Sequence, residues 1–141
     1  MNEDYDAAVV YRISAVTLLI KNMEVSWSFY SQIPGFRLVY GGSSKDTFTT
    51  FEIGANIPRV YLNLELSKTT NGYYRKDFGR IIFHTEDVDK LYSYMKSNHN
   101  ISNMVSFENE PSVASWGERY FHIREPDGYQ LSFATPIKWK K

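Results

Sequence analysis

Three histidines and one strand carboxylate are the residues of this chain best suited to metal or acid–base chemistry. The chain has no cysteine, so a thiolate metal site and a cysteine nucleophile are both excluded. Two imidazoles and one carboxylate can bind zinc or iron, and His84, His122 and Glu65 form the candidate set. The same carboxylate with either histidine could instead serve as an acid–base pair. His99 lies in a polar segment and is expected to be a solvated loop residue.

Strand alternation gathers further polar and aromatic side chains around these residues. In an extended strand every second side chain lies on the same face. The candidate ligand-binding residues selected in this way are Tyr61, Asn63, Glu65, Arg80, His84, Trp116, Tyr120, His122 and Ser132. Such a set predicts a concave site with aromatic faces for stacking and a few polar groups for orientation. Arg80 and Glu65 fit a structural ion pair as well as they fit ligand binding.

The elements that position these residues follow one order twice. The first half predicts a strand over 11–20, a helix capped by Asn22, and strands over 36–40, 47–53 and 59–66. Val25, Phe29 and Ile33 are expected on the buried stripe of that helix. After a polar linker over 67–77, the second half predicts a strand over 79–85, a helix over 88–97, and strands over 103–109, 115–123 and 128–135. The buried stripe of the second helix is expected to consist of Val88, Leu91, Tyr92 and Met95.

The order β-α-β-β-β thus recurs after about 65 residues, which indicates an internal repeat. The polar corner Lys21-Asn22 in the first half corresponds to Glu86-Asp87 in the second half. We expect an α+β protein with a single domain over 1–141. Its first module covers about 11–66 and its second module about 78–136.

Two stretches carry a family resemblance. They are "VTLLIKNMEVSWSFYSQIPGFRLVY" in the first module, and "IIFHTEDVDKLYSYM" with "WGERYFHIREPDGYQLSF" in the second. They resemble the vicinal oxygen chelate superfamily, also called the glyoxalase/bleomycin-resistance/dioxygenase proteins. The resemblance implies two tandem βαβββ modules that form a curved mixed sheet around a cleft, with the helices on the outer faces. It also implies a homodimer.

The stretch Glu125-Pro126-Asp127-Gly128 predicts the turn between the last two strands. Proline fixes φ at the first corner position and glycine accepts a positive φ. Arg119 is expected to pair with Glu125 or Asp127 across this hairpin.

The resemblance also locates the positions at which metal-using members carry their ligands. These positions fall on Ala15, on Arg80, on Ser132, and on either Asn63 or Glu65. A methyl group and a hydroxyl are poor ligands, and the permanent charge of a guanidinium repels a divalent cation. We therefore expect no standard chelate site and no metal or other cofactor.

Charge and length exclude several other classes of function. Sixteen basic and sixteen acidic residues leave no net charge to attract nucleic acid or an anionic membrane. The N-terminus is acidic and lacks the pattern of a signal peptide, so we expect a cytoplasmic protein.

The expected function is metal-independent binding of a small aromatic or polar molecule, as in sequestration of an antibiotic. The alternative is a lyase, isomerase or dioxygenase with an atypical metal or acid–base site.

Overall fold

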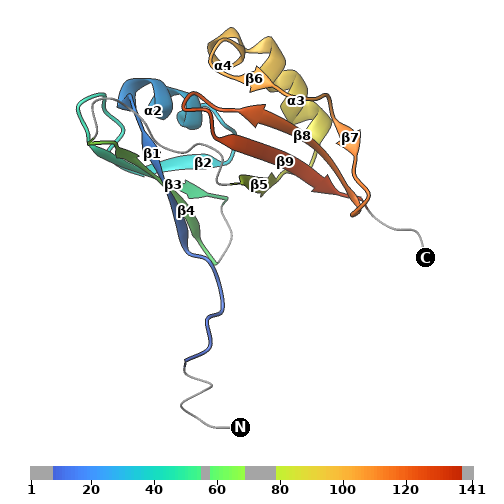
Figure 1. The fold of residues 1–141 in the computed structure, drawn as a ribbon, viewed down its shortest axis with the longest axis horizontal. Coiled ribbons are helices and arrows are strands. Elements are labelled where there is room, and N and C mark those ends of the chain that lie inside the picture. The colour runs from blue at the N-terminus through green and yellow to red at the C-terminus, as the bar shows by residue number, and fades with distance from the viewer. Residues whose placement is uncertain (1–7, 55–57, 69–78, 138–141) are drawn as a thin grey trace.

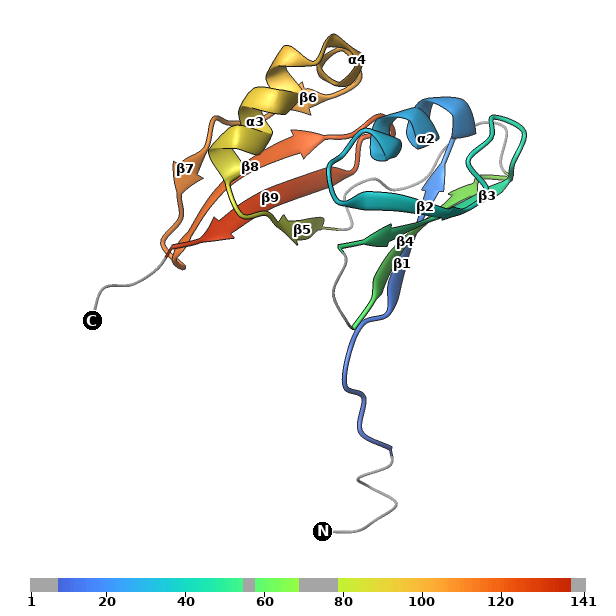
Figure 2. The same cartoon turned by 180° about the vertical axis from the view of Figure 1, so that it is seen from behind.

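The computed structural model of the protein describes residues 8–54, 58–68 and 79–137, so most of the expected linker lies outside the described residues. Figure 1 shows two sheets side by side, each covered by helix on the same side. The reverse view in Figure 2 shows the same arrangement, with an N-terminal segment that runs away from the body before the first strand.

The first module forms a four-stranded sheet in the order β1-β4-β3-β2. The strand β1 (Ala15–Ile20) pairs in parallel with β4 (Val60–Leu66), while β3 (Phe48–Ile53) runs antiparallel to both β4 and β2 (Phe36–Tyr40). Helix α2 (Met23–Ser31) begins at the predicted cap, where the Asn22 side chain accepts a hydrogen bond from the Val25 amide at 3.1 Å. The first strand begins four residues later than predicted.

The second module repeats this topology in the order β5-β9-β8-β6. Its edge strand β5 (Arg80–His84) is parallel to β9 (Gln130–Pro136), and β8 (Glu118–Arg124) is antiparallel to β9 and to β6 (Ser106–Phe107). Asp87 caps helix α3 (Val88–Ser97) as Asn22 caps α2, which confirms the corresponding corners. Two short elements were not predicted, namely β7 (Ser112–Val113) and α4 (His99–Ser102). His99 is exposed as expected but begins this short helix.

The apolar side chains of both modules meet in one core on the helix side of the sheets. Alternation along the strands is clear, because Leu18 and Ile20 are buried while Leu19 between them is exposed. Aromatic rings cross from one module to the other. The ring centroids of Phe36 and Phe83 lie 5.4 Å apart, edge to face. The face of each sheet that points away from the helices is called its open face below.

The predicted stripe of the second helix is confirmed, and that of the first helix is partly wrong. Val25 is 39% exposed, whereas Met23, Phe29 and Tyr30 are buried and Ile33 lies just after the helix in the core. The buried side chains of α2 are therefore those at positions 23, 26, 29 and 30. The polar Ser26 and Tyr30 were overlooked because their hydroxyls have partners in the other module.

Those partners are the two carboxylates of the β8–β9 turn, which is folded into the first module. Glu125 and Asp127 are each only 3% exposed. Tyr30 donates a hydrogen bond to Glu125 at 2.9 Å, and Ser26 donates to Asp127 at 2.9 Å. The Lys21 amide also donates to Asp127, again at 2.9 Å. Hydrogen bonding of buried carboxylates offsets much of the cost of removing them from water.

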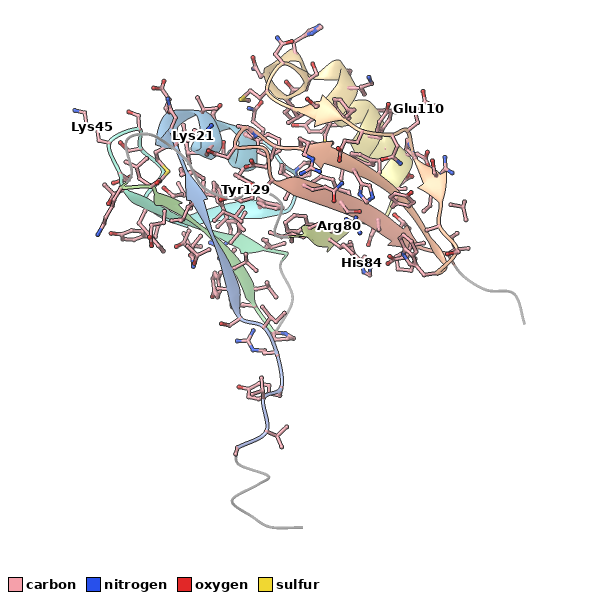
Figure 3. The ribbon with its side chains drawn as sticks, viewed as in Figure 1. Lys21, Lys45, Arg80, His84, Glu110 and Tyr129 are labelled. Carbon is pink, nitrogen blue, oxygen red and sulfur yellow. The ribbon has the colours of Figure 1, made fainter. Side chains whose placement is uncertain are left out.

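The turn itself has the predicted conformation. The Gly128 amide donates to the Glu125 carbonyl at 2.8 Å, and Gly128 has a φ of 90°. Beyond the turn, the Tyr129 hydroxyl donates to the Leu19 carbonyl of β1 at 2.7 Å. Figure 3 shows Lys21 and Tyr129 on the two sides of this junction.

The predicted pairing of Arg119 with Glu125 or Asp127 is wrong. Arg119 alternates with Phe121 and Ile123, so it lies on the helix side of β8. There it forms a two-point ion pair with Asp89 of α3, at 2.8 and 2.9 Å. Glu125 lies six residues further along the chain, which is about 20 Å on an extended strand, and the turn carboxylates are buried against α2.

Glu125 makes the stability of this junction depend on pH. Burial, and secondarily the nearby charge of Asp127, raises the pKa of Glu125 from 4.5 to about 7. The folded protein keeps this proton up to about pH 7, whereas the unfolded chain releases it near pH 4.5. The free energy of unfolding therefore falls as pH rises through this window, by on the order of 3 kcal/mol.

The substitution Glu125→Gln should remove this fall, because an amide does not titrate and its oxygen still accepts the turn's backbone hydrogen bonds. Urea unfolding between pH 4.5 and 7.5 measures the effect. The matched variant Glu110→Gln, at an exposed position, should keep the wild-type dependence on pH. An unchanged pH dependence in Glu125→Gln would contradict the assignment.

Candidate functional site

Three aromatic side chains follow one another along the open face of the second sheet. The ring centroids of Trp116 and Tyr120 are 5.6 Å apart, and those of Tyr120 and His122 are 4.7 Å apart. Trp116 is 60% exposed, while the other two rings are half-buried. Trp116, Tyr120 and His122 are called the aromatic ladder below. Neighbouring rings of the ladder are tilted by 32° and 47° to each other, and the exposed indole at its end is open to a ring–ring contact.

A carboxylate–histidine pair lies beside the exposed end of the ladder. Glu118 accepts a hydrogen bond from the Trp116 indole at 2.9 Å and lies 2.5 Å from Nε2 of His84. The indole hydrogen bond, followed by the interaction with His84, lowers the pKa of Glu118, so it is ionised at neutral pH. His84 stays more than half exposed, and Figure 3 shows it on the edge strand β5 together with Arg80.

A second polar group lies beside the buried end of the ladder. The Gln130 side chain bridges two neighbours, since it accepts from Nε of Arg80 at 2.8 Å and donates to Glu108 at 2.8 Å. Arg124 also donates to Glu108, at 3.2 Å. The hydrogen bond from Gln130, and then that from Arg124, lowers the pKa of Glu108. The carboxylate of Glu108 therefore lies near two guanidinium groups, those of Arg80 and Arg124, beside this end of the ladder.

His122 is the member of the ladder next to this polar group, and it is expected to be neutral. Burial first, and the charge of Arg80 second, lowers its pKa from the ordinary value of 6.5. Its Nδ1 atom is buried and has no hydrogen-bond partner within the described ranges 8–54, 58–68 and 79–137. Ser132 lies directly opposite His122 on the neighbouring strand and is 3% exposed.

The three candidates of the first module lie on the other sheet. Asn63 is held by neighbours on its own sheet, donating to Thr17 at 3.2 Å and accepting from Thr50 at 2.7 Å. Tyr61 meets the second module, because it lines a hollow of about 360 Å³ together with Ile82 and His84. The structure thus brings Tyr61 and His84 to one hollow, while Asn63 lies apart from the second sheet.

The profile of the Glyoxalase/Bleomycin resistance protein/Dioxygenase superfamily matches residues 12–133. The chain belongs to this superfamily. The match extends from just before β1 into β9, so it includes both βαβββ modules and the turn between the last two strands.

Several solved structures share this fold at low sequence identity. A member from Sphaerobacter thermophilus is 22% identical, with a TM-score of 0.61 over 89% of this chain and 98% of that one. A glyoxalase/bleomycin resistance protein/dioxygenase from Nocardioides is 20% identical, with a TM-score of 0.63 over 98% and 93%. A hypothetical protein from S. aureus is 18% identical, with a TM-score of 0.64 over 91% and 99%. At these identities the likeness concerns the fold alone.

No curated protein matches the chain. Among the helices of the described residues, none has the length and apolar character needed to cross a membrane.

The superfamily's metal-using members imply a chelate site that the residues of this chain do not fit. At two of its four positions the chain carries Ala15 and Ser132, and at a third the Arg80 guanidinium donates to Gln130. Across the described ranges, no three side chains of His, Cys, Asp or Glu lie close enough together to hold a metal ion. The alternative set of Glu65 with His84 and His122 is therefore not assembled. Arg80 likewise contacts Gln130 instead of forming the ion pair considered with Glu65.

The candidate residues selected from the sequence do not include Glu118 and Glu108, the carboxylates that complete the site. Alternation places Glu118 and Gln130 on the same face as the aromatic ladder, but it does not reveal which residues lie opposite each other. The observed register sets His84 and Tyr120 on either side of Ala134. This register brings side chains of β5 and β8 into reach of each other across β9. Glu118 is therefore the carboxylate that contacts His84. From the sequence alone, Glu65 is a candidate for that role.

The indole hydrogen bond can be tested through the acidity of Glu118. We expect Trp116→Phe to raise the pKa of Glu118, because the largest stabilisation of its ionised form is removed. A carboxyl ¹³C NMR titration measures this change. Trp27→Phe is a matched control, since the Trp27 indole nitrogen has no partner among the described residues. A Glu118 pKa that is the same in Trp116→Phe and in the wild type would refute the contact.

Proposed function

We propose that the protein binds a small, planar, polar molecule on the aromatic ladder of the second sheet without the help of a metal ion. The observation that carries the proposal is the exposed indole of Trp116, which continues a row of rings formed by Tyr120 and His122. Aromatic ligands gain both apolar burial and ring–ring contact on such a surface.

The polar groups beside the ladder support recognition of a ligand with hydrogen-bonding edges. Glu118 and His84 lie at one end, and Arg80, Gln130 and Glu108 lie at the other. Each end of the ladder thus has one carboxylate, which is accompanied by an imidazole at one end and by a guanidinium at the other. This balance favours an uncharged or zwitterionic aromatic compound, such as a small antibiotic, over a polycation. Sequestration of such a compound is the role that we propose.

Tryptophan fluorescence provides the test of the binding surface. With a panel of small heteroaromatic compounds, binding should quench Trp116 and raise the melting temperature. Trp116→Ala should weaken the affinity at least about tenfold, because the exposed stacking face is lost. The matched variant Tyr40→Ala, at a 64% exposed tyrosine of the first sheet, should keep the wild-type affinity. Equal losses in both variants would exclude the ladder as the binding surface.

The alternative enzymatic role is favoured by the His84–Glu118 pair. A carboxylate that accepts the Nε2 proton leaves Nδ1 of the imidazole as a proton acceptor, and this is a common arrangement for a general base. The measurement is turnover of the same compounds. For an enzyme, Glu118→Gln should abolish turnover while leaving most of the ligand affinity. If none of these compounds is converted, the His84–Glu118 pair does not act as a general base on them.

We also propose that two copies associate through the open edges of their sheets. In the described part of the chain, β1 pairs only with β4 and β5 pairs only with β9. Leu19 on β1 and Ile82 on β5 are 40% and 50% exposed, so apolar surface remains at both edges. Sedimentation equilibrium should give twice the chain mass of 16.5 kDa. A monomer at micromolar concentration would contradict this assembly.

A further inference from the structure

A buried carboxylate on the open face of the first sheet is paired with two arginines. Glu52 of β3 is 4% exposed. It accepts a hydrogen bond from Nη2 of Arg37 at 2.6 Å and another from Nη1 of Arg59. One guanidinium neutralises one carboxylate, so this group keeps one excess positive charge.

The arginines are positioned by the strands. Arg37 lies directly opposite Glu52 in the pairing of β2 with β3, and Arg59 immediately precedes β4, the other neighbour of β3. Their side chains approach Glu52 from its two sides and remain 62% and 51% exposed. Each uses one nitrogen for Glu52. Within the described ranges no other acceptor contacts either guanidinium.

A hollow of about 540 Å³ lies at this group. Its lining consists of Gly35, Phe36, Arg37, Glu52, Gly54 and Arg59. Among the described residues of that lining, two carry a positive charge and one carries a negative charge. A third guanidinium lies nearby, because Arg12 donates to the Arg59 carbonyl at 2.5 Å. The hollow is therefore electropositive although the whole chain is neutral.

We propose that Arg37 and Arg59 form a binding site for a phosphate or carboxylate group, with Glu52 holding both guanidinium groups in place. The remaining N–H donors of two arginines suit an oxyanion, because guanidinium groups match the oxygen spacing of phosphates and carboxylates. Glu52 partly competes with the ligand for these donors, so the site suits an exchangeable ligand. The proposal is independent of the aromatic ladder, which lies on the other sheet.

The first experiment titrates the protein with inorganic phosphate, and separately with acetate, against sodium chloride at matched ionic strength. Backbone amide shifts in ¹⁵N NMR spectra measure binding, and the two arms show which oxyanion is preferred. We expect saturable shifts in β2 and β3. Arg37→Gln and Arg59→Gln should each weaken the affinity at least about tenfold, since each removes charge-assisted hydrogen bonds. Arg119→Gln, which removes an arginine of the second module, should bind as the wild type does.

The second experiment separates an anion site from a purely structural ion pair. Glu52→Gln removes the competing charge, so it should tighten phosphate binding several-fold even if it lowers the melting temperature. A structural role alone predicts a lower melting temperature without any effect of phosphate. If Arg59→Gln does not fold, Arg59→Lys keeps the charge, and its loss of the paired donors should still weaken phosphate binding. The proposal is overturned if the wild type shows no saturable shifts or if the arginine variants bind phosphate as tightly as the wild type.

Discussion

The arrangement of the two modules depends on the burial of two carboxylates from one turn. Glu125 and Asp127 lie in the turn between β8 and β9 and are removed from water. They receive hydrogen bonds from Tyr30, from Ser26 and from the backbone amide of Lys21. Burial, followed by the charge of Glu125, raises the pKa of Tyr30 well above its ordinary value, so this hydroxyl remains protonated and donates its hydrogen bond. Each partner is costly to bury alone. Only the docked arrangement satisfies them together, which gives the two modules a defined orientation.

Docking of the turn also determines which surfaces are left for binding. The helix side of both sheets is filled by one apolar core, in which Phe36 of the first module contacts Phe83 of the second. This core leaves the open faces of the two sheets available for binding. On the second sheet the open face carries the aromatic ladder, and on the first it carries the Arg37–Glu52–Arg59 group. The two faces thus differ in chemistry although their strands follow the same topology.

Much of this fold could be predicted from the sequence because its signals are local. The caps at Asn22 and Asp87, the turn at Gly128 and the alternation around Leu62 and Leu64 each depend on a few neighbouring residues. The repeat of these signals then gave the topology and the family resemblance. Contacts between distant residues were predicted less well. Arg119 pairs with Asp89, thirty residues away, and the turn carboxylates bind a helix about a hundred residues earlier. Such partners follow from strand register and module docking, which no short stretch encodes.

The central claim is the proposed binding of a small organic molecule without a metal ion, in a superfamily whose metal-using members chelate one. The residues support it, since Ala15, Arg80 and Ser132 stand where ligands would be required. Elemental analysis of the purified protein tests this most directly, after overnight dialysis against metal-free buffer and again after incubation with zinc, iron, nickel and manganese. The account predicts well below one equivalent of any metal per chain in both samples. One equivalent that survives dialysis, and that is lost in Glu65→Gln or His122→Ala, would contradict it.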